Sequence, residues 1–103
     1  MEVRRIKYER MGGFTGMRLS ADFQPADLPE EQVRPLMDLL DKMDFDELPH
    51  DLTTSSAQPD QFTYTITVAT GKGEHTVIVG DASAPEEMQE LLRLLDRIAK
   101  KKH

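Results

Sequence analysis

The chain has 103 residues, contains no cysteine and carries a formal net charge of −6 at pH 7. Since a chain of this length has room for one modest hydrophobic core, we expect a single domain over residues 1–103. Without cysteine the chain can form neither a disulfide nor a thiolate zinc site. Its negative charge argues against a general nucleic-acid binder, which needs a basic face.

The first residues, 1–7, contain no apolar run of the kind that a secretory signal needs, and no segment approaches the length of a membrane span. We therefore expect a cytoplasmic protein that makes no membrane contact. We also expect a monomer when the protein is free.

Two stretches of alternating polarity predict a first pair of strands. Residues 2–10 place Ile6 and Tyr8 on one face and charged side chains on the other. Residues 17–24 alternate in the same way, with these apolar side chains on one face: Met17, Leu19, Ala21 and Phe23. The pattern predicts a hairpin with one buried face.

The sequence MGGFTG, residues 11–16, connects these two strands. Its glycines can take positive φ angles without steric cost, which suits a turn. Phe14 contributes nothing to a turn. Its side chain therefore either folds back onto the core or is presented to a partner.

Residues 29–43 predict the first helix, because apolar side chains recur at helical spacing: Val33, Leu36, Met37, Leu40 and Met43. Pro29 suits the first turn of a helix. Pro35 lies inside the pattern without a backbone donor, which predicts a kink or a later start. The segment that follows, residues 44–61, is long for a connection in so small a domain, and such loops are usually functional or mobile.

The second half of the chain repeats this plan. Residues 61–69 predict a strand with one apolar face: Phe62, Tyr64, Ile66 and Val68. The turn 71–73 leads to a strand with Val77 and Val79 inward, and residues 84–100 predict a second amphipathic helix. Ser83 and Glu86 have capping-box spacing at its start.

Together these elements predict a two-layer α+β fold of the order ββαββα, with one four-stranded antiparallel sheet and both main helices on one face. The two helices also resemble each other in sequence, Leu36–Met43 matching Leu91–Ile98. This similarity has two interpretations, an internal duplication or the common pattern of amphipathic, leucine-rich helices.

Signals for an enzyme are weak. The three histidines, His50, His75 and His103, show no metal-ligand spacing. An acidic run lacks the ligand alternation and central glycine of a calcium loop and is typical of a solvated face: Asp41, Asp44, Asp46, Glu47 and Asp51. We therefore expect no enzymatic activity, no metal and no cofactor.

Several stretches, in their order along the chain, resemble the emfourin family. They are the loop and strand from Gly12 to Leu19, FDELP at 45–49, PDQFTYTITV at 59–68, HTVIV at 75–79 and the closing Leu-rich helix. The resemblance implies a reversible bacterial protein inhibitor that blocks the active site of a thermolysin-like metallopeptidase of the protealysin type. The alternative is a protein-interaction module that uses the same loops without inhibiting a peptidase.

Candidate contact residues follow from the loop chemistry and from this resemblance. Glycines let a backbone approach another surface closely, and an aromatic anchor supplies contact area at low entropic cost. Thermolysin-like enzymes favour a bulky apolar residue just after the cut, so Gly13–Phe14 is expected to occupy the cleft. The candidates are Gly12, Gly13, Phe14, Thr15 and Gly16, with Asp60 and Gln61 from a second loop.

Overall fold

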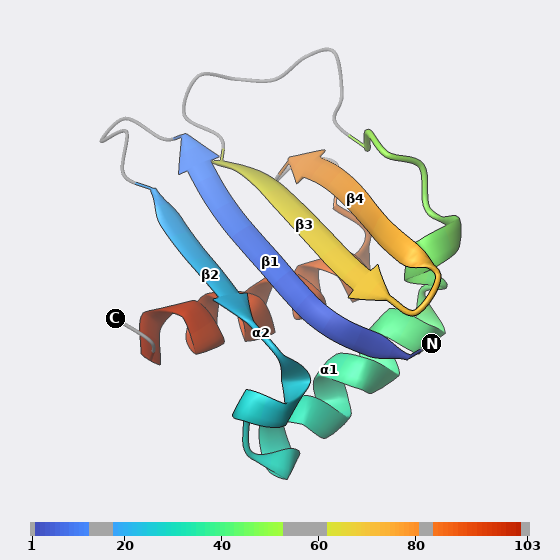
Figure 1. The fold of residues 1–103 in the computed structure, drawn as a ribbon. Helices are drawn as coiled ribbons and strands as arrows, with labels where there is room; N and C mark the ends of the chain where they lie inside the picture. Colours follow the sequence, from blue (N-terminus) through green and yellow to red (C-terminus); the bar gives the residue numbers. More distant parts are fainter. Residues whose placement is uncertain (1, 13–17, 53–61, 81–83, 102–103) are drawn as a thin grey trace.

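The computed structural model describes residues 2–12, 18–52, 62–80 and 84–101. They form one sheet whose far side is covered by both α-helices (Figure 1). The strands are β1 (Val3–Gly12), β2 (Leu19–Phe23), β3 (Phe62–Thr70) and β4 (Gly73–Gly80). The helices are α1 (Glu30–Lys42) and α2 (Glu86–Lys101), with 3-10 turns η1 (Pro25–Asp27) and η2 (Phe45–Glu47).

The sheet has the strand order β2-β1-β3-β4, and all neighbouring strands are antiparallel. The two longest strands, β1 and β3, therefore lie in the centre. Tyr8 of β1 is opposite Ala21 of β2 and Ile66 of β3. The predicted α+β class, the four-stranded antiparallel sheet and the position of both helices on one face are confirmed.

The core lies between the sheet and the helices. Alternate strand residues supply its sheet side, as the sequence predicts: Ile6, Tyr8, Ala21, Phe23, Tyr64, Ile66, Val68, Val77 and Val79. The helices contribute mainly leucines: Leu36, Leu40, Leu91, Leu92 and Leu95. Three side chains of the predicted α1 stripe, Val33, Met37 and Met43, are only partly buried. The buried stripe of α1 is thus narrower than that of α2.

Helix α1 begins at Glu30 and contains Pro35, so the predicted later start is wrong. The missing N–H of Pro35 costs one bond, to the carbonyl of Glu31. Both residues are exposed, so water can satisfy that carbonyl. The predicted capping-box residue Ser83 lies outside the described residues.

The segment after α1 has structure that its composition does not predict. Asp44 adopts φ 49° and ψ 59°, which turns the chain sharply at the end of the helix. This turn places Phe45, fully buried, in the core. Residues 50–52 then run along the outer edge of β4, where Asp51 forms a parallel bridge with Ile78.

Candidate functional site

Both candidate loops are attached at the same end of the sheet. β1 ends at Gly12, which lies directly opposite Phe62, the first residue of β3. β4 ends at that side too, with Gly80 opposite Thr63. We call this edge the loop end; its described residues are Met11, Gly12, Arg18, Phe62, Thr63 and Gly80.

Of the predicted contact residues, Gly12 alone lies within the described part of the chain. The other candidates lie outside the described residues: Gly13, Phe14, Thr15, Gly16, Asp60 and Gln61. Gly12 has φ 108°, a conformation that side chains with a Cβ rarely adopt. The glycine is therefore required where β1 passes into the loop.

On the helix side of the loop end, a polar network connects three elements. Nη1 of Arg10 in β1 donates to Oδ2 of Asp96 in α2 at 2.9 Å. The Tyr8 hydroxyl donates to the other oxygen of the same carboxylate. The Arg10 guanidinium also lies over the ring of Phe62, 4.7 Å from its centroid.

Tyr8 is the buried member of this network. Its side chain is 1% exposed and stacks on Tyr64 with ring centroids 6.2 Å apart. Burial, and secondly the hydrogen bond to Asp96, raise the pKa of Tyr8 far above its ordinary value. Tyr8 therefore keeps its proton and acts as a permanent donor to Asp96.

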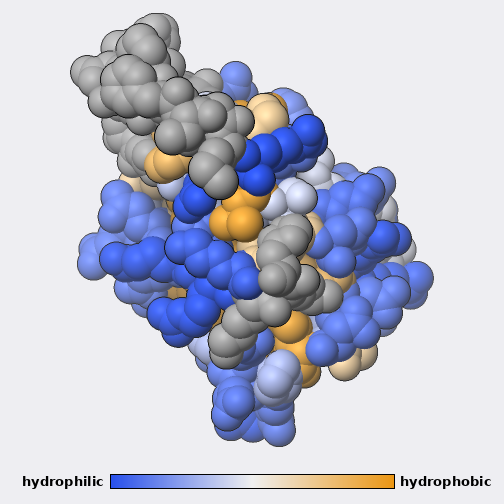
Figure 2. All heavy atoms as spheres, turned by 90° about the vertical axis from the view of Figure 1, so that its left-hand side faces the viewer, coloured by the Kyte–Doolittle hydropathy of each residue, from blue (hydrophilic) through white to orange (hydrophobic). Residues whose placement is uncertain are grey.

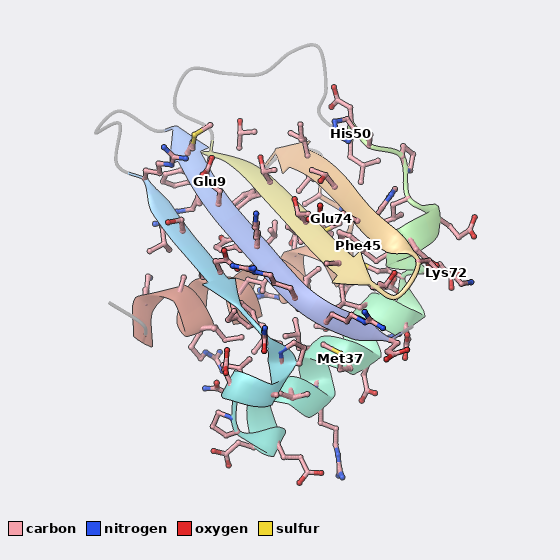
Figure 3. The ribbon with its side chains drawn as sticks, viewed as in Figure 1. Glu9, Met37, Phe45, His50, Lys72 and Glu74 are labelled. Atoms are coloured by element: carbon pink, nitrogen blue, oxygen red, sulfur yellow. The ribbon has the colours of Figure 1, made fainter. Side chains whose placement is uncertain are left out.

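The other side of the loop end belongs to the uncovered face of the sheet. Among the described residues, Met11 is the one large hydrophobic side chain that is exposed, at 41%. Arg18, the residue directly before β2, forms an ion pair with Glu9. Glu9 lies near the loop end of β1 (Figure 3). Apolar and charged groups are thus both accessible beside the Gly-rich loop.

The start of the second loop is fixed to the edge of β4. Ile78 donates its N–H to the carbonyl of His50 at 2.8 Å, and its carbonyl accepts from the N–H of Leu52 at 2.7 Å. The Nδ1–H of His50 donates to the Thr76 carbonyl at 2.9 Å. The chain therefore leaves the sheet for residues 53–61 from a fixed position; His50 lies near the end of β4 in Figure 3.

The described residues offer little for metal or membrane chemistry. Across the described ranges, no three side chains of His, Asp or Glu gather as a metal site requires. The acidic residues between Asp41 and Asp51 are exposed, which agrees with their interpretation as a solvated face. In the part of the chain that the structure covers, no helix is long and apolar enough to cross a membrane.

The family follows from the comparison with family models. The Emfourin model matches residues 8–96, which is most of the chain. The chain belongs to the emfourin family. The resemblance predicted from the Gly–Phe loop, the strand at 59–68 and the closing helix is therefore confirmed.

A solved structure of the emfourin family has the same fold. It is emfourin (M4in) from Serratia proteamaculans, described as an M4 family peptidase inhibitor. The two chains are 20% identical, with a TM-score of 0.50, and the alignment covers 89% of this chain and 88% of that one. The relative is described as an inhibitor and not as an enzyme. A search of curated proteins finds no match.

The network of Arg10 and Asp96 was missed at the sequence level, although two signals for it exist. Arg10 continues the inward positions of Ile6 and Tyr8, and Asp96 follows Leu92 by four residues on the apolar side of α2. A positive charge at Arg10 and a negative charge at Asp96, both at positions that face the core, indicate an ion pair between the two. Their separation of 86 residues left nothing local to connect them.

Proposed function

We propose that the chain is a reversible protein inhibitor of an M4 family, thermolysin-like metallopeptidase. Membership of the emfourin family over residues 8–96 carries this proposal, together with the description of the Serratia proteamaculans relative as an inhibitor of such a peptidase. The partner of this chain is accordingly an active peptidase of that family.

We further propose that the loop end enters the active-site cleft. Because Gly12 and Phe62 are directly opposed, the segments that carry Phe14 and Gln61 leave the sheet from adjacent positions. A rigid scaffold that presents several loops together is a common way to recognise another protein. Met11 adds an exposed apolar side chain at the same edge.

Phe14 is proposed as the residue that fills the pocket for the side chain after the cut. A hairpin held at both ends by β1 and β2 resists being drawn into the geometry of cleavage. Binding without distortion toward the transition state gives inhibition rather than turnover. A preorganised loop also loses less conformational entropy on binding than a free peptide does.

Titration of a purified M4 peptidase tests the function. We expect hydrolysis of a fluorogenic peptide to fall to near zero at about one equivalent of the chain, if the complex is tight. Activity should return on dilution, and the inhibitor recovered from the mixture should be intact by mass spectrometry. A serine peptidase assayed on a similar peptide is the control and should be unaffected.

Two outcomes would contradict these proposals. Full activity of several M4 peptidases, including one from the source cell, at excess inhibitor would contradict the proposed function. Progressive cleavage of the chain with recovery of peptidase activity would contradict the inhibitory mechanism and indicate a substrate instead.

A further inference from the structure

We propose that the Arg10–Asp96 ion pair is a positioning device for the loop end, which holds the bases of the two contact loops in one fixed arrangement. This inference rests on the proposed inhibitory function, because the two residues are assigned the role of positioning the proposed contact site from the helix side of the sheet. Neither residue is expected to touch the peptidase.

Arg10 lies near the strand residues at which both loops are attached. It lies in β1 two residues before Gly12, where the first loop begins. Its guanidinium covers the ring of Phe62, where the second loop ends, with 4.7 Å between Cζ and the ring centroid. Arg10 therefore lies close in sequence to the start of the first loop, and its side chain contacts the residue that follows the second loop.

Asp96 anchors this side chain to the opposite layer of the fold. Its Oδ2 accepts from Nη1 of Arg10 at 2.9 Å, and its Oδ1 accepts from the hydroxyl of buried Tyr8. The Arg10 and Asp96 side chains are only 22% and 23% exposed, so water screens the pair poorly. The loop end is thereby tied to α2 as well as to the sheet.

The stability of the core alone does not explain why a charged pair occupies these two positions. The buried Nε–H of Arg10 has no hydrogen-bond partner among the described residues. Desolvating a charged pair and leaving a donor unpaired are both unfavourable, and an apolar pair of similar volume is often as stable. The charged pair instead fixes the orientation of the Arg10 side chain, because a guanidinium that is bound by a carboxylate and stacked on an aromatic ring has one preferred geometry.

Loss of this geometry should reduce the population of the binding-competent loop arrangement. The apparent affinity falls by the same factor as that population. The double variant Arg10→Met/Asp96→Asn removes both charges while the Asn oxygen still accepts from Tyr8. We expect its inhibition constant to rise by about tenfold, with the melting temperature within about 5 °C of the wild-type value.

A matched control exists on the same strand. Arg5 of β1 and Asp22 of β2 form an ion pair at 2.6 Å on the uncovered face, nearer the other end of β1. Arg5→Met/Asp22→Asn makes the same chemical change away from the loop end. It should leave the inhibition constant within about twofold of wild type, as surface changes away from a binding site do.

A second readout does not depend on any peptidase. Amide hydrogen exchange by NMR should accelerate in the Arg10/Asp96 variant at Gly12, Leu19 and Thr63, and stay unchanged at Gly73 in the opposite turn. If the double variant fails to fold, Arg10→Lys keeps a cation beside Asp96 but loses the planar stack on Phe62. That variant should show the same exchange pattern and an inhibition constant raised about threefold.

The outcomes separate this inference from the proposed function. If wild type inhibits and the Arg10/Asp96 variant inhibits equally well, the positioning role is wrong, whatever the exchange data show. A lowered melting temperature with unchanged affinity of the folded protein would also overturn it, since the pair would then be purely structural. If wild type inhibits no M4 peptidase, the proposed function fails, and unchanged exchange at the loop end would reject the positioning role independently.

Discussion

Phe14 is the residue at which the proposed inhibition is most directly tested. Phe14→Ala removes the proposed anchor, and an anchor in a binding pocket typically contributes about 2 kcal/mol or more to binding. We therefore expect the inhibition constant to rise at least thirtyfold. The measurement is peptide hydrolysis by an M4 peptidase together with a thermal melt of the free variant.

The two interpretations of Phe14 give opposite results. A contact residue leaves the melting temperature nearly unchanged, whereas a side chain folded onto the core lowers the free energy of unfolding by about 3 kcal/mol and leaves inhibition by the folded fraction intact. Lys72→Ala, in the exposed turn at the opposite end of the sheet, serves as the control and should change neither quantity.

Tyr8 gives a pH-dependent prediction with a definite sign. Burial, and secondly the hydrogen bond to Asp96, raise the pKa of Tyr8 above the ordinary tyrosine value of about 10. The unfolded chain ionises Tyr8 near pH 10 while the folded chain keeps the proton, so the stability that Tyr8 provides is complete below about pH 10 and decreases above it. The slope is up to about 1.4 kcal/mol per pH unit.

Urea unfolding of wild type and Tyr8→Phe between pH 8 and pH 11 measures this effect. The advantage of wild type over the variant should be constant up to about pH 9.5 and then shrink by about 1 kcal/mol by pH 11. Other groups that titrate in this range cancel in the difference. A pH-independent difference would contradict the assignment of the proton to a buried Tyr8.

At the scale of elements, the segment 48–52 depends on two histidines that differ in environment. The Nε2–H of His75 in β4 donates to the Leu48 carbonyl at 2.8 Å, and its ring packs against the ring of buried Phe45 with the two planes at 90°. His50 makes its bond at the exposed outer edge. The two positions offer a matched pair of substitutions.

His75→Ala should lower the free energy of unfolding by about 1–2 kcal/mol, because it leaves the Leu48 carbonyl without this donor and removes a contact from Phe45. His50→Ala should cost less than about 0.5 kcal/mol, as exposed changes usually do. Urea unfolding gives both values, and hydrogen exchange at Leu52 reports on the bridge to β4. Equal losses in the two variants would show that the segment is not held through His75.

The elements themselves could largely be predicted from the sequence. Period-two alternation defined the buried faces of β1, β3 and β4, and helical spacing defined α1 and α2 to within about two residues at each end. The segment 44–52 could not be predicted in this way. Phe45 stands between two acidic residues, Asp44 and Asp46, without a strand or helix periodicity to mark it as buried. The bridge at Asp51 depends on backbone groups that no side-chain pattern encodes.

The whole molecule shows a symmetry that its sequence only suggests. The strand order β2-β1-β3-β4 is unchanged when the first hairpin and the second are exchanged, and the central strands β1 and β3 are antiparallel. A duplication of one ββα unit about a two-fold axis would produce this order. The pairing of β1 with β3, like the pair Arg10–Asp96, joins distant parts of the chain, so local patterns could not predict it.

The distribution of exposed apolar side chains bears on where a partner would bind. The side of the molecule shown in Figure 2 is mostly hydrophilic, with hydrophobic atoms in small separate areas. Large exposed apolar patches usually mark interaction sites. Among the described residues, the one large hydrophobic side chain that is exposed, Met11, lies at the loop end.

This division between scaffold and loops gives a prediction for the whole fold. The residues of the described core come from the strands, the two helices, Phe45 and Ala84. Replacing residues 13–16 with Asn-Gly, the residues favoured in two-residue hairpin turns, should therefore leave the sheet intact. Inhibition of the M4 peptidase should be lost, because the proposed contact residues Gly13, Phe14, Thr15 and Gly16 are removed.

The opposite turn supplies the control for this exchange. Gly71 and Lys72 connect β3 to β4 at the far end of the sheet, where Thr70 pairs with Gly73. Asn-Gly in place of Gly71-Lys72 changes the turn between β3 and β4 without altering the loop end, so inhibition should persist. Circular dichroism and thermal melts should show both variants folded, with melting temperatures within about 5 °C of wild type. Full inhibition by the variant shortened at 13–16 would refute the placement of the inhibitory contact in this loop, because a scaffold that keeps its activity without the loop must bind through another surface.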